Sequence, residues 1–345
     1  DDLATSVQSS EDGYCLYKKA KERMASAGFI LRKWLKNDTE FREKIQRQEV
    51  NSNATAEKAV ERLDETETFA QSTLQSPERS QTGTKGEKVL GLEWDPEQDT
   101  VQFYLSQVAE RAEALEPTKR NVLSLLASVF DPLGMISPTL VSIKVLFQSL
   151  VKSGADWDES LSGDNLRKFQ KWKADLRNTS EIRIPRCVCV CDFADARVTE
   201  CYIAGFGDAS KIAYCACVYL VCKLDSGLTQ VSLLASKTRV APIKELTIPR
   251  LELMSARILA QLASKVKATL GSELKIDDVK LWLDSKTALC WIKNGLEWKQ
   301  FVSHRVREIL KLTDKHSWGH VASEQNPADL GSRGRLTSEL KTDGL

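Results

Sequence analysis

The sequence predicts an α/β fold for the second half of the chain, and two features support this prediction. After Ile184-Pro185 the hydrophobic pattern takes the two-residue period of strands. Pro249 then opens a long amphipathic helix, with proline at a position that a first helical turn tolerates. Strands are expected over 198–221 (two strands), 231–240, 279–283 and 317–321, and helices from 249 and over 286–294 and 301–314. Three strands followed by alternating helices and strands indicate a sheet of mixed direction.

The first half has a different pattern. Residues 11–48 are expected to be helical, with Leu16, Ala20 and Met24 on the apolar stripe. The polar segment 51–87 is expected to be a linker or surface insertion with a short helix over 54–69, and 88–105 a hairpin with a proline-containing turn. Residues 118–179 are expected to be helical with breaks at Pro132 and Pro138, which interrupt the most apolar stretch, 121–151. That stretch is therefore predicted to form two buried helices rather than a membrane span.

Composition limits the possible functions. The 345 residues include 49 Lys+Arg and 48 Asp+Glu, a net charge of +1, so nucleic-acid binding would have to depend on local basic patches. There are nine cysteines and no CxxC pair. Several alternate as residues on one face of a strand do, and we expect them to be reduced thiols in the core of an intracellular protein rather than metal ligands: Cys187, Cys189, Cys191, Cys215 and Cys217.

Four acidic residues occur where solvated surface acids are not expected. Asp208 lies in an apolar strand, Glu252 in the first turns of the long helix, Asp284 at the end of a strand and Asp329 at the start of the final helix. Taken singly, each is also explained as a strand-end or helix-cap carboxylate. An unpaired buried carboxylate is costly, and converging acids suit two hard divalent cations in phosphodiester hydrolysis. The four together therefore predict a metal-dependent site.

The segment from about 199 to 335 resembles the ribonuclease H domain of BEL/Pao-type LTR retrotransposons. The segments that carry the resemblance are Gly205-Phe-Gly-Asp-Ala-Ser210, Ser236-Lys-Thr-Arg-Val-Ala-Pro242, Ile248-Pro-Arg-Leu-Glu-Leu253, Leu283-Asp-Ser-Lys-Thr-Ala-Leu289 and Asn326-Pro-Ala-Asp-Leu-Gly-Ser-Arg-Gly334. The resemblance implies a ribonuclease H-like mixed five-stranded sheet with helices. It also implies that Asp208, Glu252, Asp284 and Asp329 are the catalytic acids and bind two Mg²⁺ ions, with Mn²⁺ as a possible substitute.

The similarity extends upstream to the reverse transcriptase of the same elements. The matching segments are Asp1-Asp-Leu3, Gly28-Phe-Ile-Leu-Arg-Lys-Trp34, Lys88-Val-Leu-Gly-Leu-Glu-Trp94, Thr118-Lys-Arg-Asn-Val-Leu123, Phe130-Asp-Pro-Leu-Gly134 and 157–176. The resemblance implies a palm remnant at 1–106, a helical thumb and connection at 107–197, the ribonuclease H-like domain at 198–335 and a truncated tail at 336–345. Asp1 and Asp2 would be remnants of the polymerase metal site. We expect no nucleotide addition, because the first polymerase aspartate would lie upstream.

The implied substrate is an RNA–DNA hybrid, recognised through its phosphates, its shape and the 2′-hydroxyl groups. Candidate contacts near the acids are Ser210, Lys237, Arg239, Ser285, Lys286 and Arg333, with Lys211 and Arg335 as further cations. The implied partners are the rest of a Pol polyprotein, namely upstream fingers and palm and a downstream integrase. The expected location is the cytoplasm or a virus-like particle, with no membrane partner.

Two alternatives to the nuclease remain open. Asp225-Ser226-Gly227 matches the minimal signature of an aspartic peptidase, and this region of Pao elements is also classified as a peptidase. Such enzymes need two aspartates that share a proton, whereas the composition of this string suits a turn between strands, which we favour. The second alternative is a degenerate copy that binds nucleic acid without turnover. His320, nine residues before Asp329, is expected to be a packing or surface residue.

Overall fold

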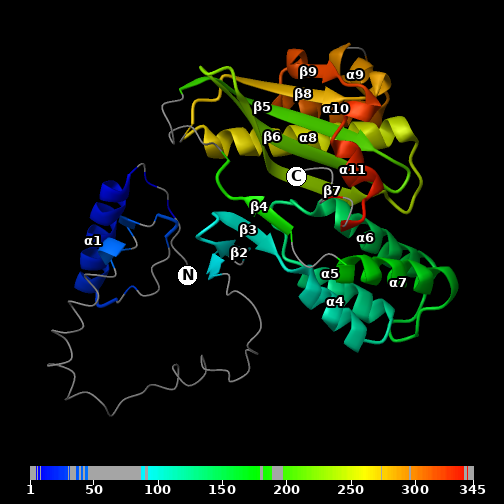
Figure 1. Ribbon diagram of the computed structural model, residues 1–345. Coiled ribbons are helices and arrows are strands. Elements are labelled where there is room, and N and C mark those ends of the chain that lie inside the picture. The colour runs from blue at the N-terminus through cyan, green and yellow to red at the C-terminus, as the bar shows by residue number, and fades with distance from the viewer. Residues whose placement is uncertain are drawn as a thin grey trace. The chain divides into compact units, whose positions relative to one another are not determined.

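The computed structural model describes most of the chain, and the segments outside it fall mainly between the first helix and the first strand. The described residues are 5, 7, 9–29, 31, 36–38, 40–41, 43–45, 87–89, 92–178, 182–188, 197–272, 274–294, 297–337 and 340. The chain divides into two compact units, Asp1–Gln102 and Phe103–Leu345 (Figure 1). The predicted helix over 54–69 and the acids Asp1 and Asp2 lie outside the described residues.

The first unit contains helix α1, Ser10–Ser26. Ser9 caps its N-terminus by accepting a hydrogen bond from the Asp12 N–H at 3.1 Å. The helix begins where it was predicted but ends at Ser26, well before the predicted end at residue 48, although residues 40–41 and 43–45 are helical again. The predicted apolar stripe is wrong. Leu16 and Met24 are 40% and 36% exposed, and the buried positions are Gly13 and Tyr17. A helix with few apolar residues buries whichever face its neighbours cover, and periodicity alone did not identify that face.

The predicted hairpin is confirmed, with one strand more than expected. Strands β1 (Glu87–Val89), β2 (Leu92–Asp95) and β3 (Thr100–Phe103) pair antiparallel in sequence order. In the β2–β3 turn, Asp99 adopts φ +50° and accepts a 2.9 Å hydrogen bond from the indole of Trp94. The second expected strand stops short, because Leu105 begins a helix.

Helices dominate the start of the second unit: α4 (Leu105–Ala114), α5 (Lys119–Ser128), α6 (Ser137–Lys152) and α7 (Gly163–Asn178), followed by strand β4 (Ile182–Pro185). The two buried helices predicted for the apolar stretch are α5 and α6. Pro138 lies in the first turn of α6 and starts that helix rather than breaking it. None of the helices in the described ranges is long and apolar enough to span a membrane.

The predicted five-stranded mixed sheet is confirmed. It consists of β5 (Val198–Ala209), β6 (Ala213–Leu224), β7 (Thr229–Val240), β8 (Asp278–Leu283) and β9 (Trp318–His320). The strand order is β7-β6-β5-β8-β9, in which β6 is antiparallel to β5 and β7, while β8 is parallel to β5 and β9. Because β5, β8 and β9 are parallel, their C-terminal ends lie together at one edge of the sheet.

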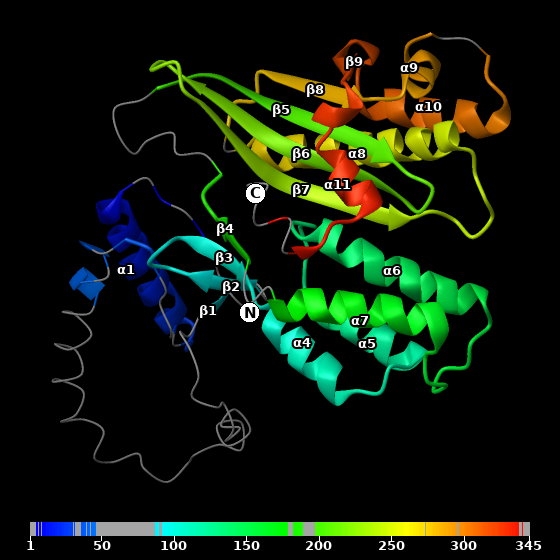
Figure 2. The same ribbon diagram turned by 45° about the vertical axis from the view of Figure 1, so that its right-hand side comes forward.

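Helices cover both faces of this sheet (Figure 2). The long helix α8 (Ile248–Leu270) packs on β5 and β6, and α9 (Lys286–Lys293) and α10 (Gln300–Leu312) lie against α8. The short helix α11 (Ala328–Arg333) and helix α6 pack on the opposite face. Gly207 permits close packing under α8, because a Cβ atom there would lie 2.8 Å from Leu283 and 3.1 Å from the Ser255 hydroxyl.

The loop before α6 is joined to the edge strand β7. The Ser236 N–H donates to the Leu133 carbonyl at 2.8 Å, and the Ser236 hydroxyl donates to the Gly134 carbonyl at 2.5 Å. Gly134 has φ +73°, and a Cβ atom there would meet the Ser236 carbonyl oxygen at 2.1 Å. Two segments of the predicted resemblance, separated by about a hundred residues, are thus in direct contact.

The cysteines in the described part of the sheet agree with the prediction of core thiols. Cys215 and Cys217 are buried free thiols that project from the same face of β6. Burial raises the pKa of Cys215 to about 12, so this thiol is neutral and a poor metal ligand. Cys187 is half-buried, and Cys189 and Cys191 lie outside the described residues.

Candidate active site

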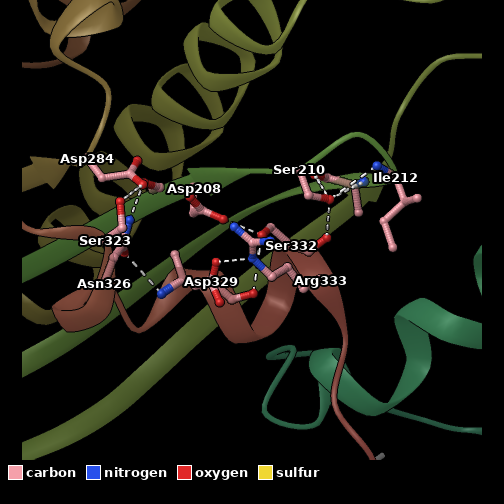
Figure 3. Close-up of polar contacts among 12 residues, drawn as sticks. Asp208, Ser210, Ile212, Asp284, Ser323, Asn326, Asp329, Ser332 and Arg333 are labelled. Carbon is pink, nitrogen blue, oxygen red and sulfur yellow. Dashed lines mark hydrogen bonds and ion pairs between the residues drawn. The ribbon is translucent and has the colours of Figure 1, made fainter.

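Asp208 lies near the end of β5 and projects toward α11. The residue is only 4% exposed, and its carboxylate accepts a hydrogen bond from the hydroxyl of Ser332 on α11 (Figure 3). Burial raises the pKa of Asp208 to about 6, and the nearby charges of Asp284 and Asp329 add to the rise while the Ser332 hydroxyl opposes it. A carboxylate held in this way is unstable as an isolated anion.

Asp284 reaches the same edge of the sheet because β8 runs parallel to β5. It directly follows β8, whose Leu283 is in register with Gly207, the residue before Asp208. Its carboxylate accepts a 2.9 Å hydrogen bond from the hydroxyl of Ser323, which belongs to a 3₁₀ turn after β9. The predicted position at the end of a strand is confirmed.

Glu252 approaches the same edge from α8. Pro249 lies in the first turn of this helix, which is separated from the end of β7 by seven residues, and Glu252 lies in the first turns, as predicted. Burial raises the pKa of Glu252, with further contributions from Asp284 and Asp208, and a hydrogen bond from Ser285 opposes the rise. Ser285 also caps α9 by accepting from the Ala288 N–H at 3.1 Å. This serine therefore connects a helix start to one of the four acids.

Asp329 is the second residue of α11. The turn before it is held by Asn326, whose side-chain amide donates to the Gly207 carbonyl at 3.0 Å and is itself buried. The Asp329 carboxylate forms an ion pair with Arg333, one turn further along the same helix (Figure 3). Asp329 thus already has a cationic partner from the protein.

The four acids interact but do not form a closed ligand cage. The charges of Asp284 and Asp329 raise the pKa of Asp208, and the charges of Asp284 and Asp208 raise the pKa of Glu252. Within the described residues, no group of three or more histidine, cysteine or acidic side chains is arranged to hold a metal ion. Oxygen donors and accumulated negative charge do match a hard divalent cation in chemistry. To complete such a site, Asp329 would have to turn from Arg333 toward the other acids.

Comparison with known families identifies the region around these acids. Residues 118–285 match the family model described as the Pao retrotransposon-like RNaseH-like domain. The chain carries a Pao retrotransposon RNaseH-like domain. The matched part of this domain includes helices α5 to α7 and strands β5 to β8 of the sheet. It contains Asp208, Glu252 and Asp284 but ends before β9 and Asp329. No curated protein sequence matches the chain.

The Pao RNaseH-like domain is also similar to solved structures at low sequence identity. RNase H1 from the halophilic archaeon Halobacterium salinarum NRC-1 shares 18% identity over 42% of this chain and 99% of that chain, with a TM-score of 0.26. LC11-RNase H1, solved in complex with an RNA/DNA hybrid, shares 14% identity over 42% of this chain and 98% of that chain, with a TM-score of 0.26. The foamy viral protease-reverse transcriptase with double-stranded DNA shares 13% identity over 70% of this chain and 38% of that chain, with a TM-score of 0.38.

The predicted nucleic-acid contacts of the Pao domain differ in their surroundings. The hydroxyl of Ser210 donates to the Ser332 carbonyl at 2.7 Å and accepts from the Ile212 N–H. Ser285 is hydrogen-bonded to Glu252. Both serines therefore already have hydrogen-bond partners within the protein. The exposed cations near the sheet edge are Lys211, Lys237, Arg239, Lys286 and Arg335. Arg333 is exposed but paired with Asp329. Lys237 and Arg239 both lie on the edge strand β7.

Sequence reasoning missed three residues that position the acids: Ser323, Asn326 and Ser332. Each makes a hydrogen bond to a partner distant in the chain, and for Ser323 and Asn326 no local pattern indicated that partner. The spacing of Ser332 from Asp329 offered one clue. Residues three apart lie on the same side of a helix, so a polar Ser332 beside an expected catalytic acid was a candidate for the same site.

Two predicted residues remain, Asp225 in a turn and His320 at the end of β9, in register with Leu283. Asp225 is exposed in the turn between β6 and β7, where its carboxylate accepts from the Arg197 N–H at 3.1 Å and Gly227 adopts φ +83°. The turn interpretation is confirmed, and the arrangement gives the peptidase alternative no support. His320 ends β9 and is exposed, as expected for a surface histidine.

Proposed function

We propose that the Pao RNaseH-like domain hydrolyses the RNA strand of RNA–DNA hybrids with the help of divalent cations. The observation that carries this proposal is the position of Asp208. Its carboxylate is buried at the sheet edge, its pKa is raised to about 6, and two further acids contribute to that rise. A protein tolerates such repulsion poorly unless a cation relieves it, so the arrangement favours metal binding over a purely structural role.

The residues that would hold the cations are Asp208, Glu252, Asp284 and Asp329. When bound, two Mg²⁺ ions, or Mn²⁺ in their place, would activate the attacking water and stabilise the departing 3′ oxygen. The protein's part is to position the acids. Ser332 orients the Asp208 carboxylate, Ser285 contacts Glu252, and Ser323 contacts Asp284. Arg333 keeps Asp329 at the site until cations compete for it.

The proposed substrate contacts are the exposed cations near this edge together with two serines. Lys237, Arg239, Lys286 and Arg333 would bind phosphate groups, and Ser210 and Ser285 would approach the backbone beside the acids. We further propose that the domain at 198–335 follows a palm remnant at 1–106 with Asp1 and Asp2, and a thumb and connection at 107–197. Its partners would be the remainder of a Pol polyprotein in the cytoplasm or a virus-like particle.

A binding domain without turnover is a second candidate function, and one observation favours it. Asp329 is paired with Arg333, and the described residues hold no preformed metal-ligand group. Such a domain would bind the hybrid equally well with or without divalent cations and would cleave neither strand. Cleavage therefore separates the two proposals.

The test is cleavage of an end-labelled RNA strand in an RNA–DNA hybrid by the 345-residue chain. We expect cleavage in Mg²⁺ and none in EDTA. Asp208→Asn, Glu252→Gln and Asp284→Asn should each lose more than the roughly 10–100-fold that outer positions of a metal site typically cost. Asp278→Asn is the matched control, because Asp278 is an exposed acid on the same strand that leads to Asp284. Loss of cleavage in the control, or cleavage in EDTA, would overturn the proposal.

A further inference from the structure

Helices α8 and α10 face each other along a series of polar and aromatic contacts that the four acids do not use. Three residues of α8 and three of α10 take part, each set at intervals of one helical turn. We call this set the arginine ladder: Arg250, Met254 and Arg257 on α8, and Phe301, Arg305 and Glu308 on α10. The two helices pack side by side on the same side of the sheet.

The contacts of the ladder centre on one phenyl ring. The guanidinium carbon of Arg305 lies 3.6 Å from the Phe301 ring centre, and that of Arg250 lies 5.0 Å from it. Arg305 also donates from Nε to the Met254 sulfur at 3.0 Å and from Nη1 to the Phe301 carbonyl at 3.0 Å. Arg257 forms an ion pair with Glu308. Phe301 thus holds two guanidinium groups in defined positions.

The ladder carries more positive charge than its own partners neutralise. It contains three arginines and one carboxylate, that of Glu308, which Arg257 occupies. Among the described residues, no carboxylate lies within ion-pair distance of Arg305 or Arg250. Burial lowers the pKa of Arg305, and the positive charges of Arg257 and Arg250 lower it further, while the charge of Glu308 opposes the shift without reversing it. A partly desolvated cation whose acceptors are a thioether and a carbonyl retains the capacity to bind an anion.

Packing alone explains part of this arrangement, since arginine stems commonly cover apolar surface. Packing does not account for the second guanidinium on the same ring or for the excess charge. Planar guanidinium groups match phosphate oxygens in geometry, and a fixed pair of them suits successive phosphates of a backbone. The ligand class indicated is therefore a phosphodiester chain.

The ladder lies close to the acids along the chain. Arg250 and Glu252 are two residues apart near the start of α8, so they project from nearly opposite sides of one helix. An α-helix with its side chains is about 10 Å thick, which is small compared with a nucleic-acid duplex. A duplex with one strand at Glu252 can therefore place other phosphates at Arg250 and Arg305.

We propose that the arginine ladder is a phosphate-binding surface that anchors the backbone of the duplex whose RNA strand is cut at the acids. This rests on the proposed function for the identity of the duplex. Binding to the ladder is electrostatic, so it does not depend on metal at the acids. Its contribution can thus be measured when cleavage is suppressed.

The experiment measures binding of a fluorescent RNA–DNA hybrid to the full chain in EDTA, by anisotropy at several salt concentrations. Arg250→Gln and Arg305→Gln should each weaken binding by about tenfold at low salt and reduce the slope of log affinity against log salt by about one. Arg307→Gln is the matched control, because Arg307 lies on α10 between two ladder positions but is exposed. The control should change affinity by less than about twofold.

Thermal melts of each variant identify loss of folding. If Arg305→Gln is unfolded, Arg250→Gln carries the test, because Arg250 is exposed and leaves the Arg305–Phe301 stack in place. Ladder variants that bind like Arg307→Gln, or a wild-type chain that does not bind the hybrid, would overturn the inference. Cleavage in Mg²⁺ is scored separately. A chain that binds through the ladder without cutting RNA would overturn the proposed function alone.

Discussion

The hydroxyl of Ser332 on α11 donates a hydrogen bond to the carboxylate of Asp208 on β5, 124 positions earlier in the chain. Ser332 is completely buried, at 0% exposure, and its carbonyl accepts from the Ser210 hydroxyl at 2.7 Å. This one residue therefore connects the final helix both to the buried acid and to the turn that follows β5. It makes α11 part of the site rather than a cover over the sheet.

Replacing Ser332 by alanine should destabilise the protein and perturb Asp208. The carboxylate would lose its donor inside the protein, so the pKa of Asp208 should rise above about 6. We expect a loss of about 1–3 kcal/mol in unfolding free energy at pH 8, measured by urea denaturation in EDTA. The loss should be smaller at pH 4, where the acid is protonated. Ser323→Ala, which removes the more exposed bond to Asp284, is the control and should cost less.

Asp208→Asn should stabilise the metal-free protein at neutral pH. The pKa of Asp208 in the folded state, about 6, lies above the value of about 3.9 for an unfolded chain. The folded state thus binds more protons between these values, and the wild type loses stability as pH rises from 4 to 6. Asparagine does not ionise, so the variant should gain up to about 3 kcal/mol at pH 7.5 and little at pH 3.5. If the variant's gain in unfolding free energy over the wild type were the same at pH 3.5 and pH 7.5, the raised pKa of Asp208 would be contradicted.

Arg333→Gln should change cation and nucleic-acid binding in opposite directions. The ion pair with Asp329 competes with a divalent cation for the same carboxylate. An exposed ion pair is worth about 0.2–1 kcal/mol, so the variant should bind Mn²⁺ about 1.5- to 5-fold more tightly by calorimetry. Its affinity for the hybrid in EDTA should fall, because a phosphate contact is lost. Weaker Mn²⁺ binding would show that Arg333 positions Asp329 for the metal instead.

Gly134→Ala should destabilise the second unit much more than Gly154→Ala. Both glycines adopt left-handed backbone conformations, with φ +73° and +71°. A Cβ atom on Gly154 has no atom within 4 Å, whereas one on Gly134 would lie 2.1 Å from the Ser236 carbonyl oxygen. The left-handed backbone at both positions should cost each alanine variant about 1–2 kcal/mol. For Gly134→Ala, displacement of the loop from β7 should add about 1–3 kcal/mol. Equal losses in chemical denaturation would mean that the loop's contact with the sheet contributes little.

Asp225→Asn should leave both stability and RNA cleavage nearly unchanged. Asparagine keeps an oxygen that accepts the hydrogen bond from the Arg197 N–H, and the residue is exposed in its turn. The expected change in unfolding free energy is within about 0.5 kcal/mol. Cleavage of a peptide substrate by the wild type that disappears in this variant would instead support the peptidase alternative.

The local sequence pattern was sufficient to predict most of the helices and strands that carry the site. The two-residue period identified β5, β6 and β7, and the stripe after Pro249 identified α8, because each of these elements buries one face against a continuous core. The position of each acid in its own element followed directly from those assignments. The pattern was less reliable in α1, where few large apolar residues distinguish the buried face from the exposed one.

Contacts between distant segments could not be predicted in this way. Strand order, register and helix packing decide which distant residues meet. They bring Ser332 to Asp208 and Gly134 to Ser236, and they stack Arg305 on Phe301 beside Arg250. These are set by the burial of whole faces against one another, and no residue pair encodes them locally. The sequence by itself determined which strands and helices form and which acids they carry. The tertiary structure alone decided which partners each acid and each arginine has, because those partners are brought together only when the sheet and its two helical layers assemble.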